Sequence, residues 1–372
     1  MTNDASRFSD DLGPTKIVHI YHPELALKAI VVVDNAAAGP AIGGTRMAED
    51  VSLEECFRLA RAMTLKNAAA GLRHGGGKSV IFADPAMAKA KKETLIRAFA
   101  QAIRELADYI PGPDMGTNEE AMAWVFDEIE RSVGLPREFG GIPLDEIGAT
   151  GWGLAVAGDE AQTFAGIDLN GARVIVQGFG AVGRHAARFL RDKGAVLVGA
   201  SDSRGAIVAP DGLDVDQLIA HKAAGHPVAR FDKGRACDED TLIATPCEIW
   251  IPAARPDVIT GENAGKLDCK LFLQGANIPA TREAEVILHE RGILSLPDFI
   301  ANAGGVICAS VEYRGGGQVA ATSEIEDKVR HNTREVLEMA QSKNCPPREA
   351  AENLAAARVK RAMALRRWGS AN

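Results

Sequence analysis

The feature that most constrains the fold is a glycine pattern of the form G-x-G-x-x-G, made by Gly178, Gly180 and Gly183. It follows an apolar run and precedes a helical run over residues 184–193. In this setting the first glycine permits a tight turn, the second lets the backbone approach a pyrophosphate, and the third lets the helix pack on the strand. The pyrophosphate then meets free N–H groups at the positive end of the helix. The pattern therefore predicts a dinucleotide site.

The next apolar run, residues 195–200, supports this interpretation because it leads to Asp202. A carboxylate in this place accepts hydrogen bonds from the ribose hydroxyls of NAD and repels the 2′-phosphate of NADP. We therefore predict NAD as the cofactor. Arg204 lies two residues further on and can accommodate a 2′-phosphate, so NADP remains an alternative. Further cofactor contacts are expected at Phe179, Ala181, Val182 and Ser203.

Short apolar runs alternate with helical stretches from about residue 172 onward, which predicts a parallel, doubly wound sheet. The length of 372 residues suits two domains, and the boundary is expected near residues 140–150. The strands are predicted over residues 172–176, 195–200, 247–252, 270–274 and 293–296, and two closing helices over 324–340 and 347–365.

A helix in the first domain is signalled by Ser52 and Glu55, which fit the capping box S-x-x-E. It is expected to end near Gly71. Further helices are expected over residues 91–108 and 118–132, and a short strand over 79–82. The apolar stripe that should bury one face of the first helix consists of Leu53, Cys56, Leu59, Ala60 and Met63.

Composition excludes several classes of function. The chain has 42 Lys and Arg against 50 Asp and Glu, a net charge of −8 without a basic cluster, which argues against a nucleic-acid surface. No apolar run approaches the ~20 residues that a membrane span needs, and the N-terminus does not resemble a secretory signal. The six cysteines are scattered, which favours free thiols in a reducing cytoplasm over disulfides or a metal site.

Three polar residues of the first domain are candidates for chemistry. Lys66 continues the apolar stripe, so it is either desolvated, with a lowered pKa, or extended to solvent. Lys78 follows three glycines and opens a strand, where it is either an acid/base with a lowered pKa or a solvated turn residue. Asp114 lies in a loop rich in proline and glycine, where a carboxylate alone is more often a turn or cap residue.

Several motifs, in order along the chain, resemble the glutamate/leucine/phenylalanine/valine dehydrogenases. The resemblance covers about residues 15–365, and its most specific part is the spacing of eleven residues between Lys66 and Lys78 with a glycine run before the second lysine. Besides the glycine pattern, the motifs are Gly39-Pro-Ala-Ile-Gly-Gly-Thr-Arg46, Met63-Thr-Leu-Lys66 through Gly75-Gly-Gly-Lys78, Pro113-Asp-Met-Gly116, Gln274-Gly-Ala-Asn277 and Pro297-Asp-Phe-Ile-Ala-Asn302-Ala-Gly-Gly305.

The resemblance implies a role for each candidate. Lys66 would bind the α-carboxylate of an L-amino acid, Lys78 would be the catalytic lysine, and Asp114 would carry a proton at the amino nitrogen. Hydride would move from Cα to the nicotinamide, and the resulting imine would be hydrolysed to a 2-oxo acid and ammonia. Residues implied to approach cofactor or substrate are Gly43, Thr150, Ala276, Asn277 and Asn302.

The substrate pocket departs from the glutamate-specific members. Those members resemble K-G-G-L-R at the first glycine pair and place a serine seven residues past the asparagine that matches Asn302. This chain has Ile42 and Ala309 at the two positions, so a γ-carboxylate would be buried unpaired at a cost of several kcal/mol. An apolar pocket suited to a branched or aromatic side chain is expected from Ile42, Met63, Gly112, Val306 and Ala309.

The apolar pocket residues place the chain in the leucine/phenylalanine-like branch of the family, but two features fit this branch less well. Residues 149–153 resemble the glutamate branch, and Cys308 stands beside the expected pocket without an assignable role. The alternatives are an enzyme of the same fold acting on an unusual amino or imino acid, or a non-catalytic NAD-binding sensor. A binder needs neither lysine nor the aspartate, which argues against the sensor.

The sequence thus predicts a two-domain α/β oxidoreductase that deaminates an apolar L-amino acid, with an active-site cleft between its domains. Residues 1–146 would form an α/β substrate-binding and oligomerisation domain, and residues 147–334 an NAD-binding Rossmann domain. The C-terminal helices, about 335–372, are expected to pack back on the first domain. The resemblance implies a cytoplasmic homo-oligomer whose partners are small molecules, without metal, nucleic acid or membrane.

Overall fold

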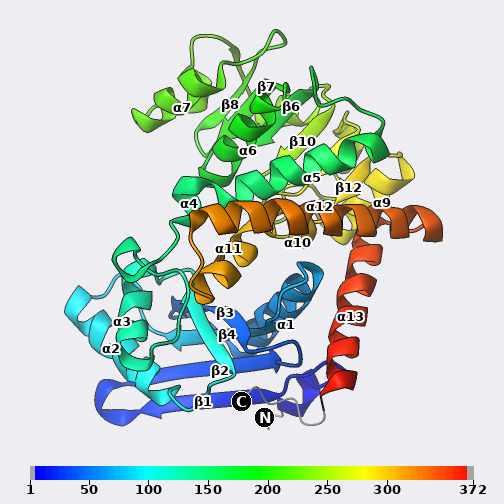
Figure 1. Cartoon of the computed structure of the whole chain (residues 1–372). Helices are drawn as coiled ribbons and strands as arrows, with labels where there is room; N and C mark the ends of the chain where they lie inside the picture. Colours follow the sequence, from blue (N-terminus) through cyan, green and yellow to red (C-terminus); the bar gives the residue numbers. More distant parts are fainter. Residues whose placement is uncertain (1–4, 367–372) are drawn as a thin grey trace. The chain divides into compact units, whose positions relative to one another are not determined.

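A computed structural model of the chain describes residues 5–366, which fold into two compact units (Figure 1). The first unit contains residues up to 143 together with 306–321 and 353–366, and the second contains 144–305 and 322–352. Each unit combines one sheet with helices. The predicted α/β class with two domains is confirmed.

The first unit is built on a five-stranded sheet of order β1-β2-β4-β3-β5. The strands β1 and β2, and β2 and β4, pair antiparallel, whereas β3 pairs parallel with both β4 and β5. Of these strands, only residues 79–82 of β4 were predicted from the sequence. The strands are β1 (Lys16–His22), β2 (Leu27–Asn35), β3 (Ala41–Ala48), β4 (Gly75–Phe82) and β5 (Tyr109–Pro113).

Helices cover both faces of this sheet, because β2 sends alternate apolar side chains to opposite sides. Ile30 and Val32 join the cluster beneath α1 (Leu53–Ala69), while Val31 and Val33 join the cluster beneath α2 (Lys89–Ala102) and α3 (Glu119–Ile129). The helices α2 and α3 lie side by side in Figure 1. The predicted helix 91–108 ends earlier than expected because the chain turns into β5.

Helix α1 begins where the sequence predicts. The N-cap Ser52 accepts a hydrogen bond from the backbone N–H of Glu55 at 3.1 Å. The predicted buried stripe is partly wrong, because Leu59 and Met63 are only half-buried. The buried face is displaced and consists of Leu53, Cys56, Ala60, Thr64, Asn67, Ala68 and Ala69.

The second unit contains a seven-stranded sheet of order β12-β11-β10-β6-β7-β8-β9. The first five of these strands are parallel, as predicted. In the core, the ring of Trp250 on β10 stacks on that of Phe272 on β11, with the ring centroids 5.8 Å apart. The last two strands were missed, and they pair antiparallel. The strands are β6 (Arg173–Gln177), β7 (Val196–Asp202), β8 (Gly205–Val208), β9 (Arg235–Cys237), β10 (Ile249–Pro252), β11 (Leu271–Leu273) and β12 (Leu294–Leu296).

The helices of the second unit include α5, which packs against α6 and supplies Glu160 for ion pairs with Arg330 and Arg334 of α12. The helices after α3 are α4 (Leu144–Ile147), α5 (Ala149–Ala165), α6 (Ala181–Asp192), α7 (Val215–Ala223), α8 (Glu239–Ile243), α9 (Arg282–Glu290), α10 (Asp298–Ala301), α11 (Gly304–Tyr313), α12 (Gln318–Lys343) and α13 (Pro347–Leu365). Within residues 5–366, none is long and apolar enough to cross a membrane.

The compact units differ from the predicted domains in two places. Residues 306–321 belong to the first unit, where Glu312 accepts hydrogen bonds from the backbone N–H groups of Gly134, Leu135 and Ile142. Residues 335–352 belong to the second unit, not the first, because buried Arg348 pairs there with Glu285 and Asp298. The remainder of the predicted C-terminal segment, residues 367–372, lies outside the described residues, as do residues 1–4.

Candidate functional site

Lys78 lies in the middle of β4 with only 4% of its surface exposed. The glycines before it belong to the strand itself, whereas a turn followed by a strand was expected. Glycines of two strands allow close packing here. A Cβ at Gly43 of β3 would lie 1.6 Å from the carbonyl oxygen of Gly77, and one at Gly76 of β4 would lie 1.9 Å from the backbone nitrogen of Thr64. The site therefore needs glycine to bring β3 and α1 against the lysine's strand.

The amine of Lys78 is poised for proton transfer. Its Nζ donates to Oδ2 of Asp114. Burial lowers the pKa of Lys78 to about 8, and the charge of Arg46 acts in the same direction. Of the two alternatives given by the sequence, burial within the strand favours the acid/base with a lowered pKa over the solvated turn residue. At neutral to mildly alkaline pH this lysine can exchange a proton, as an acid/base requires.

Asp114 directly follows β5 and is fixed on all sides. Its Oδ1 accepts from both Nε and Nη2 of Arg46 at 3.2 Å, and from the backbone N–H of Met115 at 2.5 Å. Its own backbone N–H donates to the hydroxyl of Thr117 at 2.9 Å. Arg46 was quoted in the sequence motif but received no role there, because its partner lies 68 residues away along the chain.

Lys66 lies in the last turn of α1 and is half-buried. It follows Leu59 and Met63 on the side of the helix that is not fully covered, so Lys66 lies between the two alternatives of full burial and full extension to solvent. A half-exposed ammonium on a rigid helix remains suited to binding a carboxylate.

An apolar cluster in the first unit joins two of the five residues predicted for the substrate pocket. Ile42 on β3 packs with Ile110 and Val133, and Ala309 of α11 packs against them. Gly112 borders the same cluster, since a Cβ there would lie 3.1 Å from a methyl group of Val133. Ile110 and Val133 were missed. The position of Ile110, two residues before Gly112 on a buried strand, was the available signal.

The other two residues predicted for the pocket lie outside this cluster. Met63 is half-buried on α1, and Val306 is half-buried on α11 one turn before Ala309. No role was predicted for Cys308, which is buried. Burial raises the pKa of its thiol to about 12, so the thiol stays protonated. Its neighbourhood thus remains apolar.

All six cysteines are free thiols, as expected. Among residues 5–366, no group of three or more His, Cys, Asp or Glu side chains is arranged to hold a metal ion.

The glycine pattern of the second unit forms the cradle that a dinucleotide requires. Gly178 has φ +95°, and a Cβ there would meet the backbone of Ala254 at 2.7 Å. A Cβ at Gly183 would lie 2.1 Å from the carbonyl oxygen of Gly178, whereas Gly180 faces open space. Gly180 is also the N-cap of α6. The backbone is therefore close-packed behind the turn and accessible in front of it, as pyrophosphate binding needs.

The residues around this turn differ in their burial. Phe179 is buried, and its N–H donates to the carbonyl oxygen of Ser201 at 2.6 Å. Ala181 and Val182 are half-buried in the first turn of α6, and Ser203 is exposed after β7.

Asp202 ends β7, but its carboxylate is already engaged. One oxygen accepts from Lys222 and from the backbone N–H of Val228, and the other accepts from the N–H of Arg204 at 2.8 Å. These hydrogen bonds outweigh the effect of partial burial and lower its pKa, so it is ionised at neutral pH. The guanidinium of Arg204 donates to the carbonyl oxygen of Gly225 at 3.0 Å.

Asn302 organises the loop that follows β11. Its Nδ2 donates to the carbonyl oxygen of Gly275 at 3.2 Å and to Oδ1 of Asn277 at 3.0 Å, and it also approaches Ala276. Its own Oδ1 is buried without a hydrogen-bond partner. An orphaned acceptor of this kind fits a bound amide such as that of nicotinamide. Thr150 is half-buried in the first turn of α5, where its hydroxyl lies 3.4 Å from the Cβ position of Gly305.

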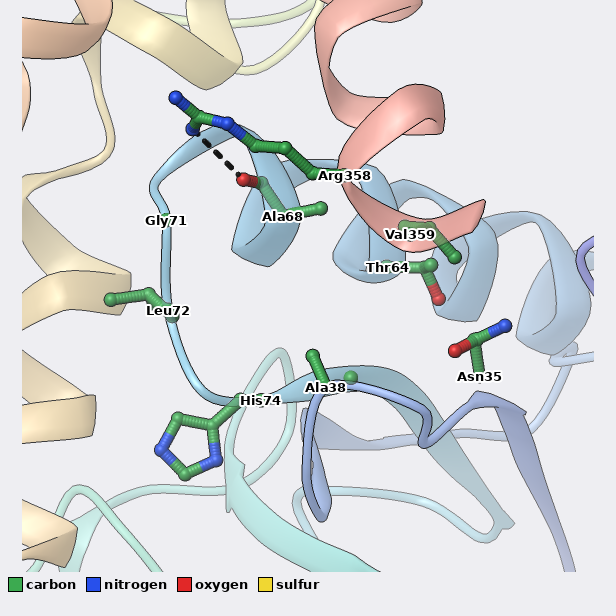
Figure 2. A pocket seen from close by; sticks show the side chains of 10 residues that line it. Asn35, Ala38, Thr64, Ala68, Gly71, Leu72, His74, Arg358 and Val359 are labelled. Atoms are coloured by element: carbon green, nitrogen blue, oxygen red, sulfur yellow. Dashed lines mark hydrogen bonds between the residues drawn. The ribbon is translucent and has the colours of Figure 1, made fainter. Parts of the chain in front are cut away.

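A separate cavity of about 210 Å³ lies beside α1 and contains none of the predicted site residues (Figure 2). Two of its polar side chains, Arg358 and Asn35, make hydrogen bonds that stabilise the fold. Arg358 of α13 donates to the carbonyl oxygens of Ala68 and Ala69 at the end of α1, at 3.2 and 2.8 Å. Asn35 donates to the carbonyl oxygen of Leu12 at 2.6 Å. These contacts hold α13 and the N-terminal segment in place.

Comparison with known proteins matches two family models to the chain. Residues 17–131 match the dimerisation domain of the Glu/Leu/Phe/Val dehydrogenases, and residues 140–367 match the Glutamate/Leucine/Phenylalanine/Valine dehydrogenase model.

Among individual proteins, a glutamate dehydrogenase from Aeropyrum pernix is 38% identical over 359 residues, covering 90% of this chain and 85% of the relative. An NADP-specific glutamate dehydrogenase from Saccharolobus shibatae is 37% identical over 308 residues, covering 79% and 72%. The crystal structure of the hetero-hexameric glutamate dehydrogenase from Thermus thermophilus superposes with a TM-score of 0.81 at 28% identity, covering 95% of this chain and 90% of that chain.

Proposed function

The chain belongs to the glutamate/leucine/phenylalanine/valine dehydrogenase family, whose members are oxidoreductases that act on a CH–NH2 group. On this premise we propose that it oxidatively deaminates an apolar L-amino acid, reversibly, to the 2-oxo acid and ammonia. The observation that carries the substrate proposal is the cluster of Ile42, Ile110, Val133 and Ala309. The four side chains of this cluster are aliphatic, so none of them can pair with a side-chain carboxylate.

The first unit supplies the groups that such a reaction needs. Lys66 binds the α-carboxylate, and Asp114 carries the proton to and from the amino nitrogen. Lys78, whose lowered pKa makes its neutral form accessible near pH 8, takes a proton from the water that attacks the imine and then polarises the forming carbonyl. A bound nicotinamide cofactor supplies the hydride acceptor.

Turnover of a panel of the twenty amino acids, followed by absorbance of the reduced nicotinamide, tests the proposal. We expect branched-chain or aromatic substrates to be oxidised with a kcat/KM at least about 100-fold above that of glutamate, because several kcal/mol oppose burial of an unpaired carboxylate. Preference for glutamate would overturn the apolar assignment. Absence of turnover with every amino acid would favour an unusual substrate or a non-catalytic sensor.

We propose NAD as the preferred cofactor, because the two cations nearest the end of β7 already have partners. Lys222 is paired with Asp202, and Arg204 is held by the carbonyl oxygen of Gly225. A 2′-phosphate would therefore meet a lysine that is already neutralised by Asp202 and an arginine that is turned to a backbone carbonyl.

Asp202→Asn releases the charge of Lys222 and tests this assignment. We expect kcat/KM with NADP, relative to NAD, to rise by about tenfold or more, equivalent to ~1.4 kcal/mol. The matched control is Asp211→Asn, which removes an exposed carboxylate of the same unit. An unchanged ratio in Asp202→Asn would remove Asp202 and Lys222 from cofactor selection.

We propose that the protein forms a homo-oligomer in which β1 pairs with a second copy. This strand forms an edge of the five-stranded sheet, and an open edge offers unpaired backbone groups to another strand. Its Tyr21 is 71% exposed, which is unusual for so large an aromatic side chain. Light scattering should give a mass above 39.4 kDa, and Tyr21→Lys should lower it. A monomeric wild-type protein would contradict the proposal.

A further inference from the structure

Arg46 connects two acidic side chains beside the buried lysine. It lies on β3, where its side chain is 19% exposed. Two of its guanidinium nitrogens donate to Oδ1 of Asp114 at 3.2 Å, and the third donates to Glu55 at 2.5 Å. The planar fork of arginine can hold two carboxylates at fixed directions, which a lysine cannot do.

The arrangement leaves a single oxygen of Asp114 directed at Lys78. Since Oδ1 is occupied by Arg46 and by the N–H of Met115, Oδ2 is the oxygen that meets Nζ of the lysine. The other end of the arginine is fixed by Glu55, whose carboxylate turns to Arg46 instead of completing the predicted capping box. The start of α1 is thereby coupled to the orientation of Asp114.

We propose that Arg46 is a positioning residue of this site, which holds Oδ1 of Asp114 and so directs Oδ2 to the amine of Lys78. The inference rests on the proposed function for its kinetic consequence, but the geometry itself can be tested without turnover. Arg46 acts through Asp114 and not by contact with the reacting carbon or nitrogen.

The charges that face Lys78 determine the sign of the effect on its titration. Arg46 from β3 opposes protonation of the amine, whereas Glu55 from α1 favours it, and the buried thiol of Cys56 stays protonated and uncharged. Asp114 favours it as well when ionised, and Arg46 offsets that charge. Removing Arg46 therefore removes a repulsive cation and leaves Asp114 uncompensated, and both changes raise the pKa of Lys78.

The test compares two variants. Arg46→Met removes both the positive charge and the planar guanidinium, whereas Arg46→Lys keeps the charge and removes only the guanidinium. Reductive methylation with ¹³C-formaldehyde makes each lysine visible by NMR, and the Lys78 signal is identified by its absence in Lys78→Met. We expect its titration midpoint to move up by about one pH unit in Arg46→Met and to stay near the wild-type value in Arg46→Lys. Both variants should lose at least about tenfold in kcat, because Asp114 is no longer oriented.

The matched control is Arg97→Met, which removes an arginine that bridges carboxylates on α2 and α3 of the same unit. It should change thermal stability without moving the titration or the pH profile of kcat/KM. A folded Arg46→Met protein with an unmoved Lys78 midpoint would overturn the inference. So would an Arg46→Lys protein with wild-type kcat. If the wild-type enzyme oxidises no amino acid, the proposed function fails, while the NMR titration still decides the role of Arg46.

Discussion

Lys78→Ala is expected to lower turnover by about 10²–10⁴-fold while leaving cofactor affinity unchanged. The buried amine has a pKa suited to proton transfer at neutral to mildly alkaline pH, and alanine cannot replace it. The dinucleotide cradle at Gly178 belongs to the second unit, so its packing does not depend on this side chain. The measurement is steady-state kinetics with the best substrate of the panel, together with a fluorescence titration of the reduced cofactor.

Two further variants separate chemistry from folding. Lys78→Met fills a similar volume and avoids the cavity that alanine leaves beside Asp114, so it should be equally inactive with a smaller loss of stability. Lys89→Ala removes an exposed lysine that pairs with Glu120 on the same unit and should be neutral. Turnover within tenfold of wild type in a folded Lys78→Met protein would remove Lys78 from its catalytic role.

The parts of the structure that the sequence predicted are those governed by local signals. The N-cap at Ser52, the tight turn at Gly178 and the parallel strands that flank it depend on residues close together in the chain, and the structure contains all of them. The family assignment is confirmed as well, because its motifs are short and specific. The leucine/phenylalanine branch and the role of each site residue stay predictions.

The missed parts depend on contacts between distant segments. Arg46 meets Asp114 across 68 residues, and Ile110 joins Ile42 only because β5 pairs with β3. No local pattern encodes such pairs. The burial of α1 was misjudged for the same reason, since the sheet that covers the helix, not its own periodicity, decides that Thr64 is inside and Met63 is half outside. The antiparallel strands after Asp202 are short and lack a distinctive pattern.

Exchanging the two pocket residues is expected to transfer specificity to glutamate. In the double variant Ile42→Lys/Ala309→Ser, an ammonium and a hydroxyl replace two apolar groups of one cluster. They supply the cation and the donor that a γ-carboxylate needs, so its burial no longer leaves a charge unpaired. We expect kcat/KM for glutamate to rise by at least about 100-fold and that for the preferred apolar substrate to fall by a similar factor.

The single variants show whether the two groups act together. Ile42→Lys alone places a charge where the native side chain is 4% exposed, so it should lower the melting temperature unless glutamate is bound. Ala309→Ser alone should change specificity little, because a hydroxyl without a cation cannot balance a carboxylate. Ile42→Val is the size control and should reduce activity on all apolar substrates by a modest, similar factor. If the wild-type enzyme already prefers glutamate and the double variant does not alter that preference, the side chain of the substrate does not enter this cluster. The carboxylate must then be recognised by other residues.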